Sequence, residues 1–89
     1  MRTIEGFRLR KVMGESVIIG EGVAQIDFNK LMALNASASY LWQSIEAREF
    51  TIDDLATLLI DKYGISTDRA KVDAASIVNE WIHNGLIQQ

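Results

Sequence analysis

Apolar and polar side chains alternate near the start of the chain, which is the spacing of a half-buried strand. Phe7 and Leu9 alternate with arginines, and the run ends at Val12 before the turn-forming segment 13–16. A β-branched run over residues 17–19, closed by a glycine-rich segment, is typical of the returning strand of a hairpin. A short apolar stretch between two asparagines predicts a third strand over residues 30–34.

The rest of the chain changes to a helical spacing, with recognisable start and stop signals. Asn35 stands where a helix N-cap is expected, because its side-chain oxygen can accept a hydrogen bond from the first turn. Thr51 and Asp54 have the spacing of a capping box, and Gly64 is a stop signal. Hydroxyl and carboxylate side chains at Ser66–Asp68 suit the start of another helix. The predicted helices cover residues 35–45, 51–64 and 66–85.

Apolar residues at helical spacing predict the inward face of each helix. This inward set comprises Ala38, Leu41, Trp42, Ile45, Ile52, Leu55, Ala56, Leu59, Tyr63, Ala70, Ala74, Ile77, Val78, Trp81 and Ile82. After the last helix, Leu86 and Ile87 can fold back onto the same core. Strands followed by helices predict an α+β fold resembling a winged helix-turn-helix, with three helices on one face of a three-stranded antiparallel sheet. We expect residues 1–89 to form a single domain.

Composition narrows the chemistry open to this chain. Among 89 residues there is one histidine and no cysteine, which excludes disulfides, thiolate nucleophiles and cysteine-based metal or cluster sites. No apolar run is long enough for a signal peptide or a membrane span, so we expect a cytoplasmic protein with no membrane partner. The net charge is −3; residues 1–34 carry a slight positive excess, and the predicted helical part is acidic.

No motif in the sequence predicts catalysis or a bound cofactor. The adjacent carboxylates Asp53 and Asp54 could support acid–base chemistry, but their position in the first turn of a helix is explained by the helix dipole. His83, near a helix end, lacks a neighbouring nucleophile or orienting carboxylate motif. The glycines at 20 and 22 lack the remaining residues of a phosphate-binding loop. We therefore expect a protein that is not an enzyme.

A winged-helix fold also raises the alternative of DNA binding. A recognition helix presents cationic and amide side chains to base edges and phosphates. Here the last predicted helix sets Arg69 and Lys71 against three acidic residues, Asp68, Asp73 and Glu80. With a net charge of −3, the chain is a poor match for a phosphate backbone, so a nucleic-acid partner is not favoured.

The order of elements and several segments resemble the PqqD-like family, whose members are also called RiPP recognition elements. The most specific segment is residues 27–42, DFNKLMALNASASYLW, which resembles the family's strand, Leu-Asn turn and aromatic helix. The opening strand FRLR, the segment TIDDL and the closing GLI resemble the family along nearly the whole chain. Two connections depart from the pattern: residues 46–50 replace a turn of the Asp-Gly type, and Ala-Ser follows Leu-Asn in place of Glu-Thr.

This resemblance implies a peptide chaperone that captures the leader of a ribosomally made precursor peptide and presents it to a modifying enzyme, for which we expect the radical SAM class. In such domains the leader adds to the open edge of the third strand beside the third helix. A scaffold subunit without a peptide ligand is an alternative, and the sheet edge could also pair with a second copy. The predicted peptide-binding residues are Lys30, Leu31, Met32, Ala33 and Leu34 on the edge, Val72, Ala75, Ser76 and Asn79 in the groove, and Arg69 and Lys71 at its mouth, where they would attract an acidic leader.

Overall fold

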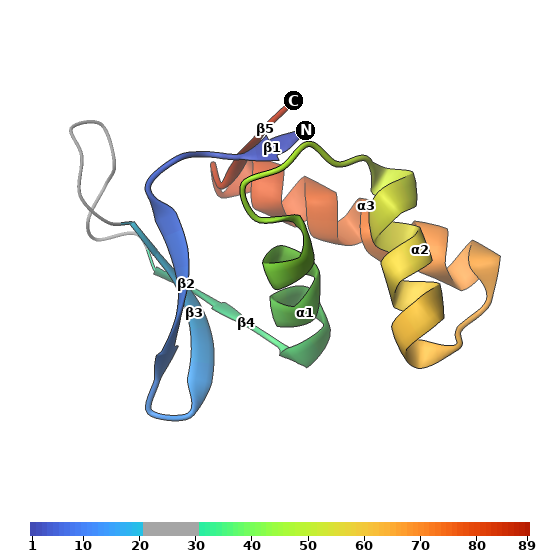
Figure 1. Ribbon diagram of the computed structural model, residues 1–89, viewed down its shortest axis with the longest axis horizontal. Coiled ribbons are helices and arrows are strands. Elements are labelled where there is room, and N and C mark those ends of the chain that lie inside the picture. The colour runs from blue at the N-terminus through green and yellow to red at the C-terminus, as the bar shows by residue number, and fades with distance from the viewer. Residues whose placement is uncertain (21–30) are drawn as a thin grey trace.

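A three-stranded antiparallel sheet precedes three helices, which confirms the predicted α+β class (Figure 1). The structure is a computed structural model and describes residues 1–20 and 31–89. The sheet lies to one side of the helices, and the two chain ends lie side by side. The elements are β1 (Arg2–Thr3), β2 (Phe7–Val12), β3 (Glu15–Gly20), β4 (Leu31–Leu34), α1 (Ala36–Ile45), α2 (Ile52–Tyr63), α3 (Thr67–His83) and β5 (Ile87–Gln88).

A tight turn joins β2 to β3 and sets the register of the sheet. Met13 and Gly14 both have positive φ, 52° and 84°, in a two-residue turn whose twist matches that of the flanking strands. Because the turn is this short, β3 begins at Glu15, two residues before the predicted return strand. The strand order is β2-β3-β4, so β3 is central and β4 lies at one edge.

The alternation of side chains across the sheet directs one face toward the helices. Leu9 pairs with Ile18, and Ile18 pairs with Met32, so these three residues share a face. Ile18 is fully buried in the core cluster, and Leu9 and Met32 pack against that cluster. The predicted strand over residues 30–34 is therefore confirmed from Leu31 to Leu34, while Lys30 lies outside the described residues.

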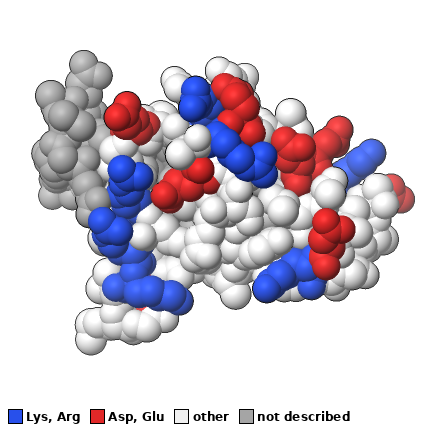
Figure 2. Space-filling view, viewed as in Figure 1, with Lys and Arg blue, Asp and Glu red and all other residues white. Residues whose placement is uncertain are grey.

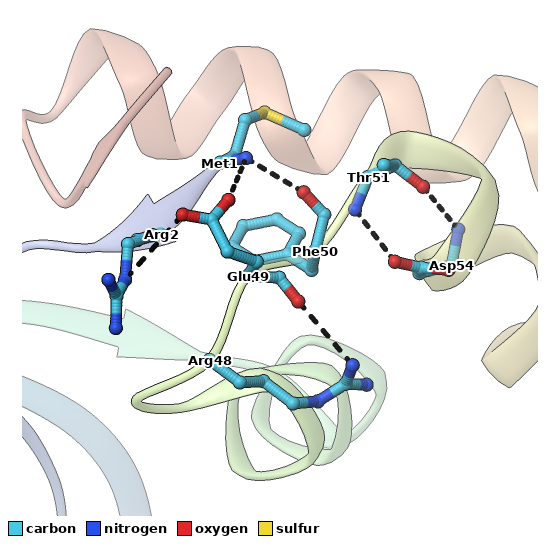
Figure 3. A network of polar contacts seen from close by, with 7 residues as sticks. All are labelled: Met1, Arg2, Arg48, Glu49, Phe50, Thr51 and Asp54. Carbon is cyan, nitrogen blue, oxygen red and sulfur yellow. Dashed lines mark hydrogen bonds and ion pairs between the residues drawn. The ribbon is translucent and has the colours of Figure 1, made fainter.

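Local hydrogen bonds fix the helix starts at the predicted residues. The Asn35 side chain accepts from the Ala38 backbone N–H at 2.9 Å. The Thr51 backbone N–H donates to Asp54 Oδ2 at 2.9 Å, and the Asp54 N–H donates back to Thr51 Oγ1 at 3.1 Å, which completes the capping box (Figure 3). Ser66 caps α3, and Gly64 ends α2 in the left-handed conformation at φ 65°.

The core lies between the helices and the inner face of the sheet. The Trp42 and Trp81 rings meet edge to face with centroids 5.2 Å apart, and both side chains are fully buried. The indole N–H of Trp42 donates to Glu46 Oε2 at 2.7 Å, so this polar group keeps a hydrogen-bond partner although the ring is buried. Other buried members of this core cluster are Phe7, Ile18, Ala38, Leu41, Ile45, Phe50, Leu55, Ala56, Leu59, Ala70, Ala74, Val78, Leu86 and Ile87.

Two residues predicted to face inward from the second helix do not. Ile52 and Tyr63 are 36% and 44% exposed. They are the first and last residues of α2, where the helix extends past the neighbours that cover its middle. The Tyr63 ring instead packs edge to face against Tyr40, with centroids 6.4 Å apart. Ile77 and Ile82 on α3 are partly rather than fully buried.

The two ends of the chain are joined by a short strand pair that the sequence pattern did not predict. β1 pairs antiparallel with β5, matching Arg2 with Gln88. The Met1 amino group donates to the Phe50 carbonyl at 2.9 Å and lies 3.3 Å from Glu49 Oε2 (Figure 3). The predicted return of Leu86 and Ile87 to the core is confirmed, since both side chains are buried.

Candidate functional site

β4 is an edge strand of the sheet that the structure describes. Among the strands that the structure describes, β4 pairs with β3 only, so the N–H and C=O groups along its other side have no partner strand. Met32 and Leu34 point to the core side and pack against the cluster, whereas Ala33 lies on the opposite face and is exposed. The predicted edge residues from Leu31 to Leu34 therefore do lie on an edge strand.

A groove opens directly after the end of β4. Its volume is about 520 Å³, and it is bounded by the turn from β4 into α1, by the end of α2 and by the middle of α3. The lining residues are Asn35, Ser37, Leu59, Tyr63, Ile65, Asp73, Ser76, Ile77 and Glu80. An unpaired strand edge that leads into a groove is the arrangement used to bind an extended peptide.

The capping interaction at the start of α1 fixes one wall of the groove. Asn35 Oδ1 accepts from the Ala38 N–H at 2.9 Å and from the Ser37 hydroxyl at 3.1 Å. Both hydrogen bonds are local, so the sequence that starts α1 also holds Asn35 and Ser37 in place. This wall is polar but already partnered, which leaves the apolar contacts to the other two walls.

The α3 wall of the groove is one helical face. Asp73, Ser76, Ile77 and Glu80 follow the spacing i, i+3, i+4, i+7, which aligns their side chains along the helix. Ile77 also packs against the core, so it forms the boundary between the groove and the interior. Of these four, only Ser76 belongs to the predicted groove residues.

The other predicted α3 residues lie on the opposite flank of the helix. Val72, Ala75 and Asn79 do not line the groove, and Val72 is 67% exposed. The apolar stripe of α3 has two flanks, and the prediction favoured the one that carries small and β-branched residues. Composition alone could not choose between the flanks, because the choice depends on which flank faces the start of α1 and the end of α2.

The two predicted cationic residues lie outside the lining of the groove. Both Arg69 and Lys71 are exposed. Arg69 Nε lies 3.2 Å and 3.1 Å from the two carboxylate oxygens of Asp73, so its charge is directed at a groove residue of the same helix. Such an exposed pair at i, i+4 is worth about 0.3–0.5 kcal/mol.

Charge is unevenly distributed over the surface. Figure 2 shows Lys and Arg side chains along the hairpin of β2 and β3, whereas both signs of charge appear over the helices. Near the groove, the Lys62 ammonium nitrogen lies 5.0 Å from the centroid of the Tyr40 ring, which in turn contacts Tyr63. This aromatic pair borders the end of α2, one of the groove walls.

The carboxylate pair and the histidine singled out in the sequence lie on different helices in the described residues. Within residues 1–20 and 31–89, no three His, Cys, Asp or Glu side chains are grouped to hold a metal ion. Asp54 is engaged in the capping box, Asp53 lies in the first turn of α2, and His83 is exposed at the end of α3. Across those same ranges, each helix is too short or too polar to cross a membrane.

Comparison with protein-family models gives a match over most of the chain. The family model described as "Coenzyme PQQ synthesis protein D (PqqD)" matches residues 15–87 of the 89-residue chain. The matched region includes β3, β4, the three helices and therefore every wall of the groove. No curated protein and no solved structure matches the chain.

Proposed function

The chain belongs to the PqqD family, and on that premise we propose that it captures the leader of a ribosomally made precursor peptide and presents it to a modifying enzyme. Family membership fits an accessory, non-catalytic role in biosynthesis of the PQQ type. We expect the enzyme to be of the radical SAM class and to supply its own cluster, and we expect the encounter to take place in the cytoplasm.

The observation that carries this proposal is the outer edge of β4, which has no partner strand among the described residues and ends at the groove. A peptide that adds to this edge gains backbone hydrogen bonds along Leu31–Leu34, and alternate side chains then point to opposite faces. The side chains on the face of Met32 and Leu34 point toward the core side, where the groove begins. Met32, with its flexible thioether, suits contact with different peptide side chains.

The sheet has a second edge, which provides an internal control. β2 also pairs with β3 only among the described strands, but the groove lies at the end of β4 and none of its lining residues comes from β2. If backbone edges alone determined binding, β2 and β4 would be equivalent. A second cavity, of about 410 Å³, lies at the start of β2 and is lined in part by Phe7 and Arg8. The proposal assigns the peptide to β4, because the larger groove of about 520 Å³ follows β4 and has one face of α3 as a wall.

Peptide selection followed by NMR tests the assignment. Random dodecapeptides displayed on phage are selected against the folded protein, and a selected peptide is titrated into isotope-labelled protein. We expect amide shifts in β4 and in the groove-lining residues of α3, together with slower hydrogen exchange along β4. Duplex DNA titrated under the same conditions should leave these amides unchanged.

Three outcomes would contradict the proposal. Shifts confined to β2, or to the Val72 flank of α3, would assign binding to another surface. Shifts in β4 that depend on protein concentration without any peptide would indicate pairing between two copies of the chain. Failure to recover any peptide that binds the folded protein would favour the alternative of a scaffold subunit with no peptide ligand.

A further inference from the structure

The charged residues that line the groove are both acidic. Asp73 and Glu80 line the α3 wall, and among the described lining residues there is no Lys, Arg or His. The sequence prediction of an acidic leader depended on Arg69 and Lys71, which lie outside this lining. A bound peptide therefore meets negative charge in the groove, whereas the sequence predicts positive charge at its mouth.

The two carboxylates differ in their partners. Asp73 is paired with Arg69 through both oxygens. Glu80 has no such cation: in the described part of the chain, no Lys, Arg or His nitrogen forms an ion pair with its carboxylate. The Asn84 side-chain amide donates to the Glu80 backbone carbonyl at 2.8 Å and not to the Glu80 carboxylate. One unneutralised carboxylate thus borders the groove.

The rest of the lining suits a long aliphatic stem. Leu59 is buried, and Ile65 and Ile77 are half-buried, so these residues give the groove an apolar lining. Ile77 lies three residues before Glu80 on α3 and therefore provides apolar surface next to it. Lysine and arginine combine such a stem with a cationic head, and they bury the stem along apolar surface while the head reaches a polar partner. An acidic side chain would meet Asp73 and Glu80 with like charge and would gain little from the apolar walls.

We propose that the groove selects a Lys or Arg side chain of the bound peptide, with Glu80 as its main partner and Ile77 beside its stem. This inference rests on the proposed function, since it assigns the chemistry of the peptide to the same site. Asp73 lies two helical turns away, about 10 Å along the axis, and is already paired with Arg69. The recognised leader therefore carries one dominant basic position among apolar residues.

The test compares peptide selection by three forms of the protein. Random dodecapeptides on phage are selected against the wild type, Glu80→Gln and the control Asp61→Asn. Asp61 is exposed on α2 and does not line the groove, so its variant changes the net charge equally without altering the site. We expect one Lys or Arg position to be enriched with the wild type and with Asp61→Asn, and to lose its enrichment with Glu80→Gln.

A quantitative arm uses one selected peptide and its analogue with norleucine in place of the basic residue. We expect the analogue to bind the wild type about threefold to fivefold more weakly, the range of a partly exposed ion pair, and to bind Glu80→Gln with less than a twofold difference. Glu80 is exposed, so its variants should keep the wild-type melting temperature, which circular dichroism checks. Charge reversal in Glu80→Lys should shift the selected residue to Asp or Glu.

The outcomes separate this inference from the proposed function. Peptides that shift the amides of β4 and the groove but carry no basic enrichment overturn the inference and leave strand addition intact. Enrichment of acidic residues with the wild type also overturns it and supports attraction by Arg69 and Lys71. Peptides that bind without shifting β4 overturn the proposed function itself. If Lys or Arg is still enriched in the peptides selected by Glu80→Gln, Glu80 is not the partner of the basic side chain and the inference is overturned.

Discussion

The two flanks of α3 border the same buried stripe but have different surroundings. The groove flank, defined by Asp73, Ser76, Ile77 and Glu80, faces the start of α1 and the end of α2. The outer flank, defined by Val72, Ala75 and Asn79, lines no part of that groove, and Val72 is 67% exposed. The outer flank has the smaller and more apolar side chains. Whether a helix face lines a groove thus depends on the elements that lie opposite it. The composition of that face alone does not predict the groove.

The largest effect is expected from removing the residue that positions both flanks. Trp81 is 1% exposed and contacts Trp42 edge to face, so Trp81→Ala should lower the free energy of unfolding by about 3–5 kcal/mol. Val72→Ala on the outer flank should change it by less than about 0.5 kcal/mol. Urea unfolding followed by circular dichroism measures both variants. Similar losses in the two variants would show that the outer flank is packed, and would contradict the distinction between the buried stripe and that flank.

A bulky side chain on each flank tests which one contacts the peptide. Ser76→Trp fills the groove, whereas Asn79→Trp adds the same side chain to the outer flank. Both positions are exposed, so both variants should remain folded. We expect Ser76→Trp to weaken a selected peptide at least tenfold, about 1.4 kcal/mol, and Asn79→Trp to change its affinity less than twofold. Calorimetric titration measures both, and the opposite ranking would assign the peptide to the outer flank.

The smallest expected effect tests which sign of charge the groove flank binds in a peptide. Arg69→Gln releases Asp73 from its i, i+4 partner, at a cost of about 0.3–0.5 kcal/mol in stability. The groove becomes more negative, so a peptide with a basic residue should bind up to about twofold more tightly. Lys71→Gln, at an exposed residue outside the groove lining, is the matched control and should change affinity less. Weaker binding in Arg69→Gln would instead support attraction of an acidic leader.

Features that depend on neighbouring residues were predictable from the sequence. Asn35, Thr51 with Asp54, and Ser66 cap the three helices as predicted, because each cap is a hydrogen bond within three residues along the chain. The hairpin of β2 and β3 was predicted for the same reason, although the pattern started its second strand two residues late. Local hydrogen bonds and apolar periodicity involve residues that are close along the chain, so the order of elements can be predicted from the sequence.

Features that depend on distant residues were not predictable. The pairing of β1 with β5 joins residues at opposite ends of the chain, and two-residue strands are too short to leave a periodic signal. Ile52 and Tyr63 fit the apolar stripe of α2 but lie at its ends, beyond the neighbours that cover the middle. Periodicity reports which residues share a face, but it does not report how far along the helix that face is covered.

The sequence by itself determined the α+β class, the helix caps, the strand after residue 30 and the acidic character of the helical half. The tertiary structure alone decided which flank of α3 faces the end of β4, and with it the replacement of Val72, Ala75 and Asn79 by Asp73, Ile77 and Glu80 in the groove lining. The physical reason is that rotation of a helix about its axis is set by packing against other helices. Changing that rotation by one residue moves each side chain by about 100°, which is enough to exchange one flank for the other.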